Sequence, residues 1–477
     1  MRSQNLLLLV IVLAPVLGSL LLPLTGAVSA RLRNALAILL VLAAVVGSAL
    51  LVPDAMAGRT QTFRADFGLG INFALKADAL AVFMALASSL ISAIILIYST
   101  GYIAHYANQN EYYLMVVLFL GAMMGLVYSA NLILLYVFWE ITAICSWRLI
   151  GFFREPMQVL RADKAFLVTV FGALAMLLGF VMLGSQQGSF DMPSAPISVA
   201  LPAAILILLG ILSKSATLPF HTWLPDAGVA PSPVTALLHA AVLVKIGVYV
   251  YARLFVVSYI PPEGFATLVM AVAATSALVS AGAALLEHDM KRIIAYSTIS
   301  QIGFIFLGLA AGNELGLAGA LIYILAHGFA KGGLFLCAGI IEHGTHTKDI
   351  RQMGGLLKTM PVTAIVFLFC AFSVMGVPPL GGFFGKYMVI SAAINSGHLV
   401  LGLVFLLGAF LTVLYLLRLF NMVFLGESRG LAGPEGTPVM VGSVVVLAAL
   451  ALASGLAIYW PALLANQAAS QMLGIAR

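Results

Sequence analysis

Long apolar runs separated by short polar stretches occupy almost the whole chain. A helix needs about 20 apolar residues to cross the hydrocarbon core of a bilayer. Backbone polar groups in lipid must be satisfied internally, so runs of this length indicate helices, and the alternation of a barrel strand is absent. The pattern predicts about fourteen transmembrane helices, at residues 6–22, 35–52, 79–103, 112–129, 132–153, 165–184, 201–218, 233–255, 264–286, 293–311, 316–341, 361–395, 399–424 and 439–464.

Proline and glycine interrupt the seventh and the twelfth of these segments. The seventh runs into 214–219 and then 221–226, and the twelfth breaks at 376–382 and resumes over 383–395. Proline costs a helix about 3 kcal/mol, so such breaks in a membrane need protein or a water-filled cavity to satisfy the freed groups. Helices four to eight and nine to thirteen each form a group of five whose fourth member is broken. This arrangement predicts two inverted five-helix repeats with discontinuous helices seven and twelve.

The predicted fold class is therefore an all-α integral membrane protein with four parts. These are the N-terminal helices 1–3 in residues 1–111, the first repeat in 112–255, the second repeat in 264–425, and the last helix in 439–477. Residues 1–30 also resemble a secretory signal, because a small-residue site ends them. The run from residue 6 to residue 22 is long enough to span, so we expect a retained first helix.

Composition agrees with a protein that has little mass outside the bilayer. The 477 residues are 62% hydrophobic and 8% charged, with a mean hydropathy of +1.12. A soluble domain carries about 25% charged residues. The net charge of +6 would suggest a nucleic-acid partner for a soluble protein, but here it reflects basic loops. We expect the lipid bilayer and other membrane subunits as partners, and no nucleic acid.

The lysines and arginines of the loops predict the orientation. Loops after odd-numbered segments hold eleven of them, and the opposite loops and termini hold six. Because basic residues concentrate in cytoplasmic loops, both termini are predicted on the outer side of the cell inner (plasma) membrane. The eleven are Arg31, Arg33, Arg154, Arg161, Lys164, Lys291, Arg292, Lys348, Arg351, Lys358 and Arg429, and the six are Arg2, Arg59, Arg64, Lys76, Arg253 and Arg477.

Five ionisable residues lie inside the apolar segments, namely Glu140, Lys214, Lys245, Lys331 and Lys386. Each such charge costs about 2.5–3.5 kcal/mol on insertion scales. No structural need accounts for five of them, so they are candidates for moving protons or cations. The alternatives are purely structural roles. Lys214 and Lys386 would then cap carbonyls freed at the helix breaks, and Glu140 would be only a counter-ion.

The chain contains no sequence motif for catalysis, for metal binding or for binding a cofactor. Cys145, Cys337 and Cys370 are far apart within apolar segments, which excludes a disulfide framework, a zinc site and an iron–sulfur site, and they are expected to be small buried hydrophobes. The sequence has no P-loop, no dinucleotide fingerprint, no HExxH and no nucleophile–base pattern. We expect no cofactor and no metal, so any redox energy must come from a different protein of the complex.

Several stretches together resemble a known family. They are Phe138–Glu140 with Ser146 and Leu149–Phe152, Lys214–Ala227, Pro231–His239, Asp289–Gly303, and His327–Lys331. Over roughly residues 65–425 the chain resembles the antiporter-like membrane subunits shared by respiratory complex I, Mrp-type cation/proton antiporters and membrane-bound energy-converting hydrogenases. Arg148 departs from the pattern, because a neutral residue is expected there.

The resemblance implies a polar axis through which protons move. Its implied members are Glu140 on helix five, Lys214 on helix seven, His239 and Lys245 on helix eight, His327 and Lys331 on helix eleven, and Lys386 after the break in helix twelve. The two histidines could equally be hydrogen-bonded core residues, although histidine can accept and pass on a proton near pH 7.

Glu140 and Lys214 would act as a switch if they are neighbours. Burial disfavours an ammonium, while a nearby carboxylate favours it. At an effective dielectric constant near 20 the attraction is about 4 kcal/mol at 4 Å. Closing the pair would hold Lys214 charged, and opening it would let Lys214 release its proton to the next group, with water in the gaps between helices.

Three functions fit the sequence. The first is a proton-translocating subunit of a redox-driven membrane complex, without its own redox centre and with a soluble redox module as partner. The second is a Na⁺/H⁺ antiporter subunit of an Mrp-type complex. The third is a membrane scaffold whose buried charges are relics, and the complete set of five charges argues against it. Nothing in the chain separates the first two.

Overall fold

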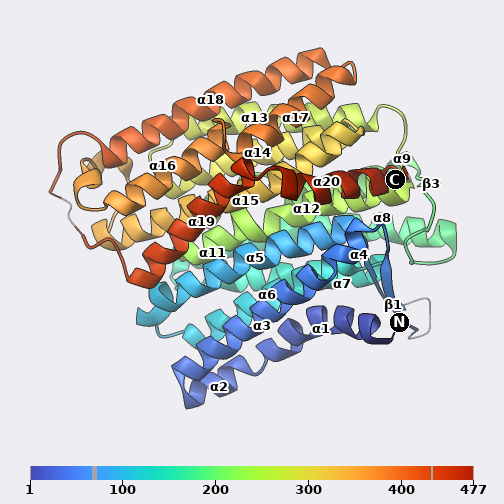
Figure 1. The fold of residues 1–477 in the computed structure, drawn as a ribbon, viewed down its shortest axis with the longest axis horizontal. Coiled ribbons are helices and arrows are strands. Elements are labelled where there is room, and N and C mark those ends of the chain that lie inside the picture. Colours follow the sequence, from blue (N-terminus) through green and yellow to red (C-terminus); the bar gives the residue numbers. More distant parts are fainter. Residues whose placement is uncertain (1, 67–71, 431–432, 476–477) are drawn as a thin grey trace.

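Helices packed side by side into one bundle make up almost all of the computed structural model, which describes residues 2–66, 72–430 and 433–475 (Figure 1). Their bounds are α1 Arg2–Ser19, α2 Leu22–Val28, α3 Ala30–Leu50, α4 Val52–Met56, α5 Ala79–Tyr102, α6 Gln109–Tyr128, α7 Leu132–Ile150, α8 Pro156–Gln187, α9 Leu201–Lys214, α10 Trp223–Asp226, α11 Ser232–Ala236, α12 Leu243–Tyr251, α13 Phe265–Leu286, α14 Met290–Ala310, α15 Glu314–Thr345, α16 Pro361–Met375, α17 Gly381–Asn395, α18 Leu399–Phe424, α19 Pro438–Leu456 and α20 Tyr459–Met472.

Two small strand pairs complete the described structure. Strand β1 Gln61–Asp66 pairs antiparallel with β2 Asn72–Ala77, and β3 Ile197–Ser198 pairs parallel with β4 Tyr259–Ile260. The start of α1 and the end of α20 lie at the same end of the bundle, with the β1–β2 hairpin beside them (Figure 1). We call this the terminal end, and we call the opposite end, which carries Arg154, Lys164, Arg292 and Arg351, the basic end.

The long apolar helices make this a multi-span membrane protein. Eleven helices of the described residues are long and apolar enough to cross a bilayer, or twelve if the bent pair formed by α1 and α2 is one span. Helices α9 and α16 are apolar but shorter. The sequence-based number of fourteen counts α9 and the α16–α17 pair as spans as well, and it stays a prediction.

The two predicted helix breaks are confirmed. Helix α9 ends at Lys214, and the next long apolar span, Ser232–Ser258, begins with the short helix α11. Helix α16 ends at Met375, and α17 begins at Gly381. Gly376 ends α16 with a φ of +89°, a left-handed conformation that glycine adopts without steric cost. Lys214 thus lies at one break, and Lys386 lies in the second turn of the helix that follows the other.

Polar residues at the helix starts fix where several spans begin. Asp78, Asn131, Asp289 and Asn313 each accept a hydrogen bond from a backbone N–H of the first turn of α5, α7, α14 and α15. Such a cap satisfies a donor that has no partner within the helix. These caps therefore fix the residue at which each of the four helices begins, whereas the apolar pattern alone gives that residue only approximately.

Helices α14 and α15 form the centre of the bundle. Both are almost wholly buried, whereas fewer than half of the residues of α3, α18 and α19 are buried. Helix α15 packs against α5, α14, α16, α17, α19 and α20. Because α15 carries His327 and Lys331, its central position brings these two residues within reach of several other helices.

Two cations that the sequence analysis counted among the loops are buried at the ends of the bundle. The guanidinium of Arg253 donates to both carboxylate oxygens of Asp78, at 2.5 and 2.7 Å, and Arg253 is only 3% exposed. Lys291 is 1% exposed, and its Nζ lies 2.6 Å from a carboxylate oxygen of Glu342. The first pairing joins segments 175 residues apart, and the second joins the consecutive helices α14 and α15. Both cations therefore contribute to packing between helices as well as to the charge of the loops.

Candidate functional site

Lys214 lies beside Glu140 without a direct ion pair. Its Nζ donates to the backbone oxygen of Trp139 at 3.2 Å and lies 5.2 Å from the centre of the Trp139 ring. Glu140 is the next residue on α7 after Trp139. Within the described part of the chain, no N–O distance between the two is within 4.0 Å, and Oε1 of Glu140 has no hydrogen-bond partner. Lys214 therefore reaches α7 next to Glu140 without pairing with its carboxylate, and the switch stays a prediction.

Helix α9 brings Lys214 close to the helix that carries Lys245. Ser215 lies against Gly247 on α12, where an added Cβ would come 1.9 Å from the Ser215 hydroxyl oxygen. Such close approach requires glycine on α12. Lys214 and Lys245 are thus on directly packed helices, although no hydrogen bond between them is recorded among the described residues.

A π-helical turn at Leu237–Ala241 changes the geometry expected for His239 and Lys245. A regular α-helix would place residues six apart on different faces. Here Nζ of Lys245 donates to the backbone oxygen of His239 at 3.0 Å. Turns of this kind release a carbonyl from the normal helix ladder and occur often at functional sites. His239 itself is fully buried, its ring centre lies 4.4 Å from that of Phe335, and neither ring nitrogen has a partner among the residues that the structure describes.

A direct hydrogen bond joins the side chains of Lys245 and His327. Nζ of Lys245 lies 2.7 Å from Nδ1 of His327, and the two residues are each 1% exposed. A neutral imidazole nitrogen accepts from an ammonium, and a protonated one donates to a neutral amine. A proton can therefore pass between these two side chains along an existing hydrogen bond, from α12 to α15.

Lys331 shares helix α15 with His327 but binds α14. Its Nζ donates to the backbone oxygen of Ile294 at 3.0 Å and lies 2.6 Å from the hydroxyl oxygen of Ser297. It is fully buried. Lys386 on α17 is 4% exposed, and its Nζ has no hydrogen-bond partner among the described residues. It lies 4.6 Å from the ring centre of Phe304, a contact that favours a cation.

The site also contains neutral polar residues that the sequence analysis did not single out. They link α14, α15 and α18 by hydrogen bonds and are all fully buried: Ser297, Gln301, Tyr323 and Tyr415. Ser297 and Gln301 belong to the stretch 289–303 that supports the family resemblance, and Tyr323 lies one helical turn before His327. The sequence marks these residues only by their polarity within an apolar segment long enough to cross the membrane. Because they carry no charge, they resemble the polar residues of ordinary helices.

The arrangement gathers positive charge with little to neutralise it. Four buried lysines and two buried histidines share one partly buried carboxylate, Glu140. Like charges at partly buried distances repel by several kcal/mol. Some of these groups must therefore be neutral at any moment, and a change at one of them alters the balance at the next. Among the described residues, no group of three or more histidine, cysteine or acidic side chains could hold a metal ion.

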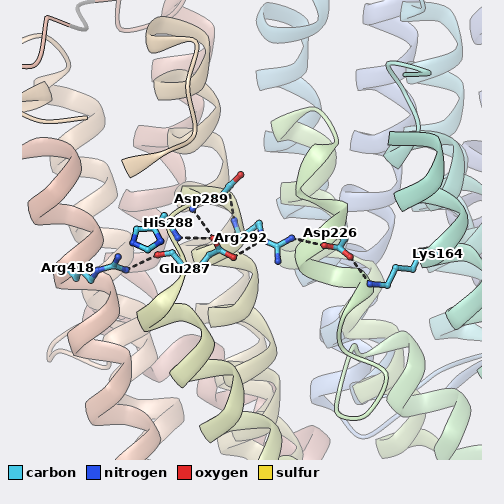
Figure 2. Close-up of polar contacts among 7 residues, drawn as sticks. All are labelled: Lys164, Asp226, Glu287, His288, Asp289, Arg292 and Arg418. Atoms are coloured by element: carbon cyan, nitrogen blue, oxygen red, sulfur yellow. Dashed lines mark hydrogen bonds and ion pairs between the residues drawn. The ribbon is translucent and has the colours of Figure 1, made fainter. Parts of the chain in front are cut away.

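A chain of ion pairs crosses the basic end and ties both halves of the chain together (Figure 2). Asp226, which follows the first helix break, pairs with Lys164 at 2.7 Å and with Arg292 at 2.6 Å. Arg292 also pairs with Glu287 at 2.8 Å, and Arg418 on α18 donates to the Glu287 backbone oxygen. The broken segment is thus held between α8 and α14.

Arg148, the residue that departs from the family pattern, has a local explanation. Its guanidinium donates to Glu111 on α6, and Arg154 pairs with the other carboxylate oxygen of Glu111 at 2.5 Å. Arg148 lies near the end of α7, so this pairing fits the sequence-based interpretation of an anchor at the membrane boundary.

We expect Asp226→Asn to destabilise the protein by about 1–2 kcal/mol at pH 7, since it weakens hydrogen bonds between charged groups. Burial opposes ionisation of Asp226, but the hydrogen bonds from Lys164 and Arg292 outweigh it and hold the pKa of the carboxyl below its usual 3.8. This stabilisation is complete above that value and is lost as the pH falls through the lowered pKa. Thermal unfolding of the solubilised protein should show a gap between wild type and variant that closes below about pH 4.

The control is Glu263→Gln, which changes an exposed carboxylate in the loop before α13. It should unfold as the wild type does at every pH. A gap between the Asp226→Asn variant and wild type that persists unchanged in acid would contradict the role given to these ion pairs.

Comparison with known proteins places the chain in a family. Residues 129–412, more than half of the chain, match the family described as NADH:quinone oxidoreductase/Mrp antiporter, TM, and residues 65–113 match the complex I chain 5 N-terminus. The chain is 36% identical over 428 residues to a Na(+)/H(+) antiporter subunit of Alkalihalophilus pseudofirmus and 34% identical over 429 residues to one of Staphylococcus haemolyticus. These matches cover 80% and 81% of this chain but 52% and 53% of the relatives, so the chain spans about half of their length.

Two solved structures have the same fold. A chain of the Mrp complex from Dietzia sp. DQ12-45-1b superimposes with a TM-score of 0.90 at 22% identity, over 99% of this chain and 98% of that one. A chain of an archaeal membrane-bound sulfane sulfur reductase superimposes with a TM-score of 0.89 at 22% identity, over 98% of both chains. The fold agrees with the family match over residues 129–412 and with the relatives at 36% and 34% identity, which show that the chain belongs to the NADH:quinone oxidoreductase/Mrp antiporter family of membrane proteins.

Proposed function

We propose that this chain translocates protons through its row of buried lysines, as one component of a multisubunit membrane complex that exchanges Na⁺ for H⁺. The observation that carries the proposal is the 2.7 Å contact between Lys245 and His327, two buried groups that can exchange a proton directly. The names of the relatives at 36% and 34% identity support cation/proton exchange over a redox-driven pump.

Each predicted site residue has a role in this proposal. Glu140 sets the charge of Lys214, and His239, Lys245, His327 and Lys331 pass protons between the two repeats. Lys386 is the last proton site of the row. Within the described part of the chain, the buried polar atoms without a protein partner include those of Glu140, His239, His327 and Lys386, and ordered water between them would complete the path.

A redox-driven complex is the second candidate host. The similarity to a chain of the sulfane sulfur reductase, described as an archaeal respiratory membrane complex, favours it, but at 22% identity that likeness extends to the fold alone. In such a host the same lysine row would move protons, and a soluble redox module would supply the energy. The chain itself would still contribute no redox centre.

The architecture is proposed on the same basis. Residues 112–255 and 264–425 would form the two inverted repeats, flanked by 1–111 and 439–477. The basic end would face the cytoplasm of a cell whose plasma membrane holds the complex, and both termini would face outward. A cysteine placed in the exposed loop at Gly397 should then react with an impermeant thiol reagent added outside intact cells, and one placed at Gly430 should not.

The experiment that tests the function uses the complex that contains this chain, reconstituted in liposomes with a pH-sensitive dye. A pulse of Na⁺ should move protons in the opposite direction, and an equal pulse of choline should not. Proton movement that ignores Na⁺ but follows the addition of an electron donor would overturn Na⁺/H⁺ exchange in favour of the redox-driven host.

A further inference from the structure

The backbone of α19 lies directly against the segment that joins α16 to α17. A Cβ added to Gly455 on α19 would overlap the carbonyl oxygen of Pro379 and would lie 2.6 Å from the backbone nitrogen of Gly381. Any side chain at position 455 would force this backbone to move, so the contact requires glycine. A Cβ added to Gly381 would in turn overlap the hydroxyl oxygen of Ser454, the residue before Gly455. We call Ser454 and Gly455 the α19 clasp.

The segment that the clasp contacts also determines where Lys386 lies. Residues 376–380 separate α16 from α17, and Lys386 is in the second turn of α17. The stem of this lysine lies against the end of α16, because a Cβ added to Gly376 would come 3.2 Å from its Cδ. Nζ of Lys386 has no hydrogen-bond partner within the residues that the structure describes. The packing of α17, and no hydrogen bond shown there, therefore sets the position of this ammonium.

Helix α15 contacts α17 as closely as α19 does. A Cβ added to Gly385 on α17 would lie 2.6 Å from the Cβ of Tyr323 on α15. Nζ of Lys386, the next residue, lies 5.9 Å from the ring centre of Tyr323 and 4.6 Å from that of Phe304. Both α15 and α19 pack against α17. A displacement of the start of α17 from α19 would therefore move Lys386 relative to these rings.

The first helix break has a comparable contact. The backbone N–H of Leu218 donates to the hydroxyl of Ser276 on α13 at 3.1 Å. One long span, Ser232–Ser258, separates the first break from α13, and one long span, α18, separates the second break from α19. Each broken segment is thus in contact with the second span that follows it, through a buried serine in both cases. The α19 clasp has its counterpart at the break that carries Lys214.

We propose that the α19 clasp positions Lys386 for proton transfer, because Ser454 and Gly455 fix the segment 376–382 from which α17 begins. Both are positioning residues, and neither takes up a proton or binds an ion. The proposal rests on the proposed proton translocation, and it gives α19, which lies outside both proposed repeats, a part in the last step of the row. Proton transfer needs its groups in a precise geometry, and a misplacement of about 1 Å can cost about 100-fold in rate.

The test compares variants of the whole complex in the liposome assay. Gly455→Ala should lower the maximum rate about tenfold to 100-fold, because the backbone of the break must move. The half-saturating Na⁺ concentration should stay within about twofold, because the clasp binds no ion. The pH at which the maximum rate is half of its highest value should shift by about half a unit or more, because the surroundings of Lys386 change. A variant that merely folds less well would lose the same factor at every pH.

The matched control is Gly442→Ala. Gly442 lies on the same helix, is exposed, and has nothing within 4 Å of an added Cβ among the residues that the structure describes. This variant should transport as the wild type does at every pH. It separates the effect of the clasp from any general effect of replacing a glycine in α19.

An exchange of size between the two sides tests the contact itself. Gly381→Ala should lower the rate less than Gly455→Ala, because a serine hydroxyl can turn aside and a backbone carbonyl cannot. Ser454→Gly removes the obstructing hydroxyl and its Cβ. The double variant Gly381→Ala with Ser454→Gly should therefore recover to within about twofold of Ser454→Gly alone, as expected for residues in direct contact.

A wild-type rate in Gly455→Ala would overturn the clasp, and so would a loss that is equal at every pH or a double variant that does not recover. If Gly455→Ala does not assemble, Gly381→Ala and its double variant decide alone. The proposed function is tested separately by Lys386→Met. Normal transport in that variant would remove Lys386 from the proton path, whereas an inactive Lys386→Met beside active glycine variants would remove only the clasp.

Discussion

Replacement of Lys214 by methionine is expected to reduce Na⁺-driven proton movement by about 100-fold or more, the lower range of what a positioned proton-transfer group contributes. Methionine keeps the length and packing of the side chain but cannot carry a proton. Because the hydrogen bond of Lys214 goes to a backbone oxygen, that of Trp139, and joins no second charged group, the complex should still assemble. The measurement is the initial rate of proton movement in liposomes, set against the amount of complex recovered.

Lys214→Arg separates charge from proton exchange. Arginine keeps the positive charge next to Glu140 but does not give up its proton in proteins. We expect this variant to be as inactive as the methionine variant. Lys358→Met, at an exposed lysine of the basic end, is the control and should leave transport unchanged. An active arginine variant would show that Lys214 supplies charge alone and that protons take another route.

Lys386→Met is expected to stop turnover to a similar extent, because the row then ends without its last proton site. Lys386→Glu keeps an exchangeable proton at the same position. The carboxylate, however, would face the ring of Phe304, whose negative π-face favours the present ammonium. We therefore expect an activity between those of the methionine variant and the wild type.

The same liposome assay tests whether Lys386 lies on the proton path. If the methionine variant transports as well as the wild type, Lys386 is not on the path, and the break between α16 and α17 needs another explanation. Equal and complete loss in both variants would mean that the position requires an amine rather than any proton carrier. Complex recovery after purification controls for assembly in each case.

The apolar pattern of the sequence determined the membrane class, most helix positions and the two breaks. Transfer out of water is the largest favourable contribution to the free energy with which a long apolar segment enters the membrane. Proline in a helix interior disrupts the helix. The five ionisable candidates were predictable for the same reason, since a charge in a run of lipid depth costs several kcal/mol and is rarely retained without a function. Local rules suffice for these features because each depends on residues that are close in the chain.

Only the tertiary structure decided which of these residues meet. A straight helix separates His239 from Lys245, whereas the π-helical turn brings the backbone oxygen of His239 to Lys245. The packing of this turn against α15 brings Lys245 to the ring of His327. The sequence predicts that Glu140 and Lys214 lie within direct or water-bridged reach, but only the structure shows that Lys214 binds the backbone oxygen of Trp139, the residue before Glu140. Asp78 and Arg253 are 175 residues apart, and nothing in either local pattern pairs them.

The neutral residues around Lys331 show the same limit most clearly. Gln301 has no charge, so its insertion into the membrane costs less free energy than that of a lysine or a glutamate. The sequence analysis therefore did not single it out. Its hydrogen-bond partners come from the packing of α14 against α15 and α18, which sets Tyr323 and Tyr415 at opposite ends of one amide. The sequence by itself thus determined what lies at membrane depth and which groups can carry charge. The tertiary structure decided their hydrogen-bond partners, because these depend on side chains brought together from distant helices.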